Sequence, residues 1–233
     1  MPIPDDLRVI AERANRELDA VHDFFVHSKS VWQSFVIVVG EGHRTVAENL
    51  ATGTRVDQDE LVRLAPQYTW EYLATFTFRQ FVSAFEVFLF EFLHRLLQHN
   101  PWQFAKRSLD FEAVLEAGSR DEIISDILSK QLNELKYEQL REWFVAINKA
   151  VKLECPTESD IDALAEIKAA RDILEHNAGV VNDIYCRKAR KKARYAPGDQ
   201  IEIDDTYHLE CWSLLKKVVA DVTTAAIAKL ATP

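Results

Sequence analysis

One segment of the chain, residues 67–99, does most to set the fold class. Its phenylalanines recur at alternating spacings of three and four residues: Phe78, Phe81, Phe85, Phe88 and Phe92. This period places all five side chains on one face of an α-helix. Aromatic rows serve as stacking platforms for nucleic-acid bases in some proteins, but a row at helical spacing is more often the core face of a helix. We therefore expect a long, buried central helix that ends before Pro101.

Apolar residues at helical spacing also run through most of the remaining chain. We expect further helices over residues 5–28, 110–117, 123–135, 140–151 and 157–177, a short helix or turn over 180–189, and a final helix that begins at Asp204 or Asp205. The sequence thus predicts an all-α fold, an up-and-down bundle of about six to eight helices. We expect one domain over 1–233, with its core in 67–230 and less certain N-terminal helices in 1–60.

Three segments have a less regular pattern. Residues 31–39 are apolar and β-branched, and they either extend the first helix or form a short strand. Residues 41–60 are polar and contain glycines, so we expect a connection with one or two further turns of helix. Residues 200–203 alternate in polarity, which is typical of a short strand.

The overall charge is acidic, but one short run is strongly basic. The chain carries 28 Lys and Arg against 37 Asp and Glu, a net charge of −9, which argues against a general DNA-coating protein. Six basic residues lie within 187–194: Arg187, Lys188, Arg190, Lys191, Lys192 and Arg194. Such a run is either a solvated surface or a local site for a polyanion. A chain reversal at Gly179 would bring it back toward the preceding helix, so we assign it to phosphate binding.

Cysteine use and the apolar segments bear on the compartment. The three cysteines, Cys155, Cys186 and Cys211, form no CxxC pair, so we expect a reducing cytoplasm rather than a disulfide framework. The N-terminal residues lack the apolar core of a secretory signal. Charged residues interrupt the apolar stretch 73–97, so we expect no membrane span.

We expect no metal site and no cofactor. Glu91 and His94 form a Glu-x-x-His pair of the kind used by di-iron bundles, but the sequence has no second pair. Phosphate-binding and dinucleotide-binding glycine motifs are also absent.

Polar side chains gather at the end of the helix expected over 157–177: Arg171, Asp172, His176 and Asn177. A histidine in the last helical turn is near the negative end of the helix dipole, which favours its protonated form and suits proton transfer. An arginine can hold phosphate in a fixed geometry. On spacing alone, a surface helix end with a capping histidine is the more ordinary interpretation.

The stretch EIKAARDILEHNAGVVNDIYCRKA (166–189) resembles the HEPN domains of stand-alone bacterial ribonucleases, which occur in toxin–antitoxin and phage-defence systems. The residues that match are Arg171, Asp172, His176, Asn177, Gly179 and Tyr185. Residues 81–101 are similar to the family's long aromatic helix and 195–215 to its closing turn and helix. The resemblance covers most of 67–230. Some family members carry a Tyr two residues after the His, where this chain has Ala178, so regulation through that Tyr does not follow.

The resemblance implies a homodimer with a composite RNA site and metal-independent cleavage by attack of the ribose 2′-OH. It implies that His176 is the acid and base, that Arg171 stabilises charge on the phosphorus, and that Asp172 and Asn177 position these groups or the substrate. An antitoxin protein is an implied further partner. The alternative is a catalytically inactive HEPN-like scaffold that binds a protein or a nucleotide, because a fold alone does not establish activity.

Overall fold

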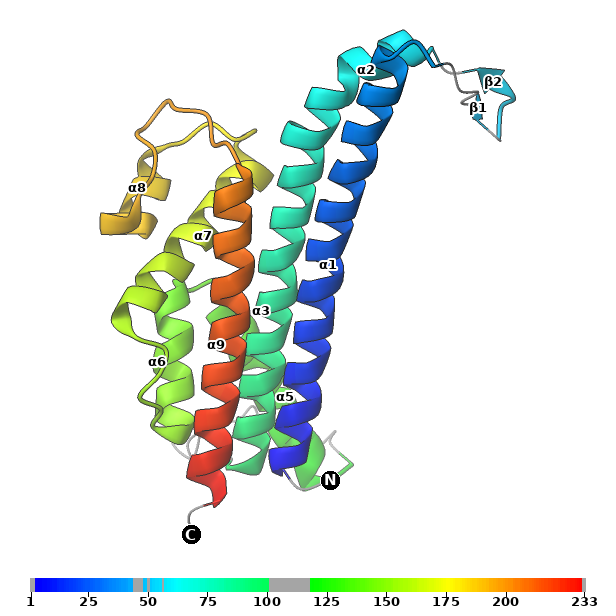
Figure 1. Cartoon of the computed structure of the whole chain (residues 1–233). Coiled ribbons are helices and arrows are strands. Elements are labelled where there is room, and N and C mark those ends of the chain that lie inside the picture. The colour runs from blue at the N-terminus through cyan, green and yellow to red at the C-terminus, as the bar shows by residue number, and fades with distance from the viewer. Residues whose placement is uncertain (1–2, 44–47, 50, 56, 101–117, 232–233) are drawn as a thin grey trace.

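The structure, a computed structural model, describes the whole chain except residues 1–2, 44–47, 50, 56, 101–117 and 232–233. It is an all-α helical bundle, which confirms the predicted fold class. The long helices α1, α3 and α9 lie side by side, and α6, α7 and α8 cover the side away from α1 (Figure 1). The helices are α1 (Ile3–Gly40), α2 (Gln58–Pro66), α3 (Ala74–His99), α5 (Arg120–Lys136), α6 (Leu140–Val151), α7 (Glu158–His176), α8 (Asp183–Ala189) and α9 (Asp205–Ala231).

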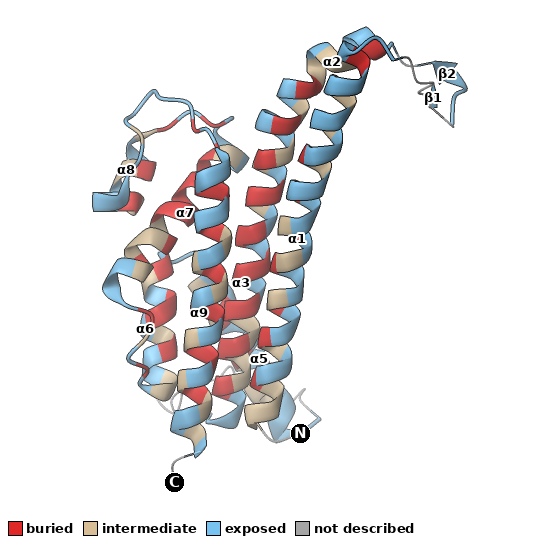
Figure 2. Ribbon diagram, viewed as in Figure 1, coloured by how far each residue is buried: buried red, intermediate tan, exposed pale blue. Residues whose placement is uncertain are grey.

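The phenylalanine row is the centre of the core. All five rings are at most 2% exposed: Phe78, Phe81, Phe85, Phe88 and Phe92. Burying a phenylalanine side chain contributes roughly 1.5–3 kcal/mol, so this face stabilises the bundle strongly. The core interpretation of the row is therefore confirmed, and Figure 2 shows the buried face of α3 turned toward its neighbours.

Residues 31–39 extend α1 rather than forming a strand. With α2 and the π-helical segment Gln67–Leu73, the end of α1 forms an arm that extends beyond α7 and α9 (Figure 1). Beyond Lys29, Val39 is the one buried residue among the described residues of α1. The β-branched residues of this stretch are helical because they continue a long helix that packs against an antiparallel neighbour.

Three other expectations have mixed outcomes. Part of 41–60 forms a small antiparallel hairpin of β1 (Glu48–Asn49) and β2 (Thr54–Arg55), ahead of α2. The strand expected over 200–203 is wrong, because only an isolated bridge joins Gln200 to Val180 there. The helix expected over 110–117 lies outside the described residues.

By length and composition, the continuous helix Gln58–His99 is apolar enough to cross a membrane, although 44% of its most apolar window is buried inside the bundle. The buried core helix of a soluble protein passes the same test.

The two ends of α7 follow from local sequence signals. Thr157 begins the helix with a capping box, in which its side chain and that of Asp160 each accept a backbone N–H. The helix ends at His176, and Gly179 has a φ of +80°. L side chains rarely adopt this backbone conformation, which favours glycine at the reversal, and a Cβ there would also have to displace the side-chain amide of Gln200, 2.2 Å away. The chain then turns back into α8, beside α7.

Candidate functional site

A cavity of about 900 Å³ lies beside the C-terminal half of α7, bounded also by α3, α8 and the turn between α5 and α6. Its walls include all four residues predicted as catalytic and one from the basic run: Arg171, Asp172, His176, Asn177 and Lys188. The size falls in the range of small-molecule binding sites. The structure therefore brings the predicted site residues together at one hollow.

A cluster of ion pairs lies along one wall of this cavity. Arg171 Nη2 donates to Glu86 Oε1 at 2.5 Å, and Lys168 Nζ donates to the same oxygen at 2.9 Å. Lys188 Nζ donates to Asp172 Oδ2 at 3.0 Å. Three cations thus share two carboxylates, which leaves the cluster with one net positive charge.

The cluster holds Asp172 as a carboxylate. Burial raises the pKa of Asp172, but the charges of Lys168, Lys188 and Arg171 together outweigh it, and the pKa lies below its ordinary value. Asp172 is therefore a carboxylate at neutral pH.

Arg171 is largely buried and paired with carboxylates. Its side chain is 16% exposed and its guanidinium is engaged by Glu86 and, at 3.4 Å, by Asp172. An incoming phosphate must therefore compete with a carboxylate for this group. The sequence does not predict this pairing, because Glu86 comes from α3, 85 positions away in the chain.

His176 and Asn177 differ from Arg171 in this respect. His176 is exposed, and its ring has no hydrogen bond or ion pair to any described residue. Asn177 is also exposed, but its side-chain amide donates to the carbonyl of Val180 and fastens the turn after α7. The imidazole of His176 is free to reach a ligand in the cavity, whereas Asn177 shapes the backbone that presents it.

The basic run divides into paired and free residues. Lys188 pairs with Asp172, and Arg194 lies over the ring of Tyr207 at 3.6 Å and pairs with Asp204 at 3.6 Å. The other four are exposed and form no ion pair with any described residue: Arg187, Arg190, Lys191 and Lys192. The contact between Lys188 and Asp172 places the start of the run against α7, as the reversal at Gly179 predicts.

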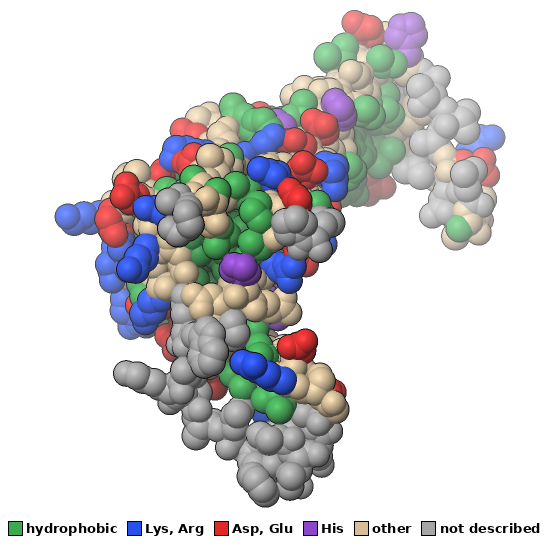
Figure 3. All heavy atoms as spheres, turned by 90° about the horizontal axis from the view of Figure 1, so that it is seen from below, with side chains coloured by type: hydrophobic (Ala, Val, Ile, Leu, Met, Phe, Trp, Pro, Cys, Tyr) green, Lys and Arg blue, Asp and Glu red, His purple; other side chains and the backbone are tan. Residues whose placement is uncertain are grey.

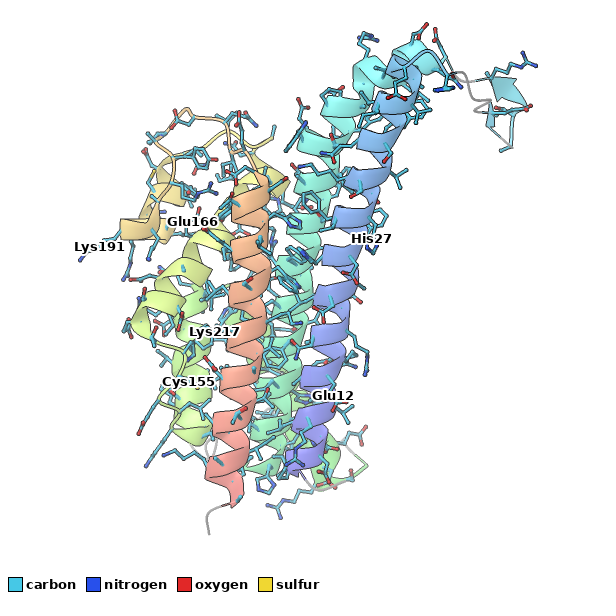
Figure 4. All side chains as sticks on the ribbon, viewed as in Figure 1. Glu12, His27, Cys155, Glu166, Lys191 and Lys217 are labelled. Atoms are coloured by element: carbon cyan, nitrogen blue, oxygen red, sulfur yellow. The ribbon has the colours of Figure 1, made fainter. Side chains whose placement is uncertain are left out.

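The free part of the run faces solvent. Lys191 points away from the body of the molecule (Figure 4). Viewed from below, Lys and Arg side chains gather at the left edge, the side that carries α6 and α8 in Figure 1 (Figure 3). The acidic chain therefore has a local positive surface next to the cavity.

A buried carboxylate fixes α8 against α7. Glu166, 3% exposed, accepts hydrogen bonds from the hydroxyls of Tyr185 at 2.7 Å and Tyr207 at 2.6 Å. Burial raises the pKa of Glu166, and the two hydroxyls oppose that rise. Tyr185, which the resemblance includes, thus has a structural contact that positions α8 and the basic run.

Several cavity residues were missed by the sequence analysis. Glu86 lies in the phenylalanine helix and Lys168 next to the apolar face of α7, where neither forms a recognisable motif. Tyr137 lies at the break in helical phase between two helices. Only Tyr137 gave a local signal, an aromatic residue at a turn.

Within the described residues, no group of three or more His, Cys, Asp or Glu side chains is arranged to hold a metal ion. The site is defined by cations, carboxylates, one free imidazole and aromatic rings. Comparisons with protein-family models, with curated proteins and with solved structures found no match to this chain. The class that the fold and site define is an all-α bundle with a cavity at a helix end that is lined in part by charged and in part by apolar side chains.

Proposed function

We propose that the chain is a metal-independent endoribonuclease of the HEPN type, acting in the cytoplasm as part of a toxin–antitoxin or phage-defence system. One observation carries the proposal: Arg171, Asp172, His176 and Lys188 line one cavity at the end of the helix whose sequence resembles the HEPN motif. Titratable and cationic groups that converge on a concave site are the usual basis for assigning catalysis.

The roles follow from where each group lies. The ribose 2′-OH attacks the adjacent phosphorus, the bond to the 5′ oxygen breaks, and the products are a 2′,3′-cyclic phosphate and a 5′-OH. The exposed imidazole of His176 accepts the proton that the attacking 2′-OH loses and donates a proton to the departing 5′ oxygen, so the step leaves no net change in protons. Arg171 and Lys168 supply positive charge to the phosphate, which replaces Glu86 as their partner. Asp172 holds Lys188 at the wall.

A homodimer is part of this proposal. A second hollow, about 790 Å³, lies on the other side of the end of α7, where Leu174 and Gly179 meet exposed aromatic residues of the arm and of the first turn of α3. These are Trp70, Tyr72 and Phe76. A second copy packed over this aromatic row would bring two α7 ends together and leave the first cavity open for RNA.

The test is cleavage of RNA by the purified full chain in the presence of EDTA. We expect cleavage to continue, with 2′,3′-cyclic phosphate and 5′-OH ends, and to stop when the nucleotide before the scissile bond is 2′-deoxy. Mass spectrometry of the fragments identifies the ends. Loss of cleavage on chelation with recovery on adding Mg²⁺, or products with 5′-phosphate ends, would overturn the proposal.

The free basic residues give a second prediction. Replacing Arg187, Lys191 and Lys192 together by alanine is expected to weaken RNA binding and to flatten its log–log salt dependence by about 2, because each phosphate contact on a single strand contributes about 0.7. Anisotropy of a labelled, non-cleavable 2′-O-methyl RNA at several salt concentrations measures this. The oligomeric state should not change, because so charged a run cannot form an interface core.

The matched control for this prediction removes the same charge from exposed lysines elsewhere: Lys130, Lys149 and Lys229. If both triple variants change the salt slope equally, the basic run has no special role. The prediction also fails if the variant of Arg187, Lys191 and Lys192 binds RNA with the salt dependence and the affinity of the wild type.

The second candidate function is a scaffold that binds RNA, a nucleotide or a protein partner without cleaving. The pairing of Arg171 with Glu86 favours it, because a catalytic phosphate must displace that carboxylate. Tight binding of a cleavable RNA that stays intact over long incubation would select this candidate, whereas turnover selects the ribonuclease.

A further inference from the structure

Part of the cavity is not used by the mechanism proposed above. Three large apolar side chains line it while remaining open to solvent, and each comes from a different element. They are Val87 of α3 at 55% exposure, Tyr137 of the α5–α6 turn at 92%, and Ile184 of α8 at 49%. Scattered exposed apolar residues are ordinary, but their convergence on a single cavity is typical of a ligand site.

The floor of this part is aromatic with cations beside it. The rings of Phe90 and Trp143 meet edge to face at 4.8 Å. Lys136 Nζ lies 5.4 Å from the centre of Phe90, and Lys168 Nζ lies 5.2 Å from the centre of Trp143. An apolar surface next to positive charge is complementary to a flat ring attached to an anion.

The turn that carries Tyr137 is fixed to this floor. The indole N–H of Trp143 donates to the carbonyl of Leu135 at 2.7 Å, and the N–H of Tyr137 bonds back to the last carbonyls of α5. The backbone is therefore held while the ring of Tyr137 stays in solvent. The ring offers an exposed stacking face on a fixed backbone at the cavity mouth, so that only the side-chain torsions of Tyr137 must be ordered when a ligand binds.

We propose that this half of the cavity is a nucleobase subsite, an inference that rests on the proposed ribonuclease function. An unpaired base next to the scissile phosphate stacks on Tyr137 and lies against Val87 and Ile184, while its phosphate faces Lys168 and Arg171. A cavity of about 900 Å³ is far larger than a phosphate alone requires. The substrate is then single-stranded RNA, because the bases of a duplex have both faces covered by their neighbours.

The test uses a short 2′-O-methyl RNA, which the full chain cannot cleave, and a matched oligonucleotide with an abasic site at the cleavage position. Tyr137→Ala is expected to weaken binding of the base-containing RNA about 5- to 150-fold, the loss of one base–aromatic stack. Tyr137→Phe keeps the ring and should bind as the wild type does. On the abasic RNA, the wild type and Tyr137→Ala should bind equally.

The matched control is Phe24→Ala, which removes an exposed ring of α1 outside the cavity and should leave affinity unchanged. Equal affinity of the wild type and Tyr137→Ala for the base-containing RNA overturns the subsite, as does absence of any binding. If the wild type and Tyr137→Ala bind equally and RNA is still cleaved with the expected ends, the ribonuclease proposal stands and only the subsite is rejected. Ring-dependent binding without cleavage has the opposite meaning: the subsite stands and the ribonuclease fails.

Discussion

Replacing His176 by alanine is expected to slow RNA cleavage by about 10²- to 10⁴-fold, the usual contribution of one acid–base group. The melting temperature should not change, because the ring is exposed and forms no hydrogen bond or ion pair with a described residue. Single-turnover cleavage with RNA in limiting amount measures the loss, and circular dichroism measures the melting.

His27→Ala is the matched control, because His27 is an exposed histidine of α1 that lies far from the cavity (Figure 4). Persistence of cleavage with the same products in His176→Ala would remove the site assignment. Arg171→Ala is a less clean test, since it also strips Glu86 of an ion-pair partner inside the bundle. We therefore expect Arg171→Ala to lower both activity and stability.

Periodicity predicted the helices well because the core of this bundle is local in sequence. The phenylalanine row lies on a single helix, so a period of 3.6 residues is enough to show which face is buried. The end of α7 was equally accessible, because a capping Thr157 and a left-handed Gly179 act within a few residues. The strand prediction for 200–203 failed for the opposite reason. An alternating segment becomes a strand only when a partner strand pairs with it, and here the pairing is a single bridge between Gln200 and Val180.

The candidate site was predictable only in part. The start of the basic run was expected to fold back against α7, and Lys188 does contact Asp172, because the reversal at Gly179 between them is a local feature. The ion pair between Arg171 and Glu86 depends on how α3 packs against α7, which no spacing in the sequence reveals. Tyr137 lies at the cavity because the α5–α6 turn packs onto Trp143, a tertiary contact that the sequence pattern does not reveal.

A buried histidine away from this site should make the fold sensitive to acid. His208 of α9 is fully buried, with its ring 3.8 Å from that of Phe25 and 4.6 Å from that of Phe81. Its Nε2 lies 2.9 Å from the hydroxyl of Thr77, which itself donates to the carbonyl of Leu73. The imidazole therefore donates from Nε2, and its buried Nδ1 has no hydrogen-bond partner among the described residues.

Protonation would add an N–H at Nδ1 and a charge, and neither is compensated there. Burial, reinforced by the neighbouring His22, lowers the pKa of His208 from 6.5 to about 4. Between pH 6.5 and about pH 4, His208 binds a proton in the unfolded chain but not in the native state. Acidification therefore favours unfolding, and the stability lost through His208 approaches about 3 kcal/mol near pH 4.

We expect the free energy of unfolding to fall between pH 7 and pH 4.5. That fall should be smaller by about 2–3 kcal/mol in His208→Phe than in the wild type. Urea denaturation at each pH measures it. His27→Phe, which changes an exposed histidine, should keep the wild-type dependence. If His208→Phe does not fold, a titration of the His208 ring by NMR replaces it. An equal loss of stability in the variant and the wild type, or a ring that titrates near 6.5, would show that His208 does not set the acid limit, because its protonation would then cost the native state nothing.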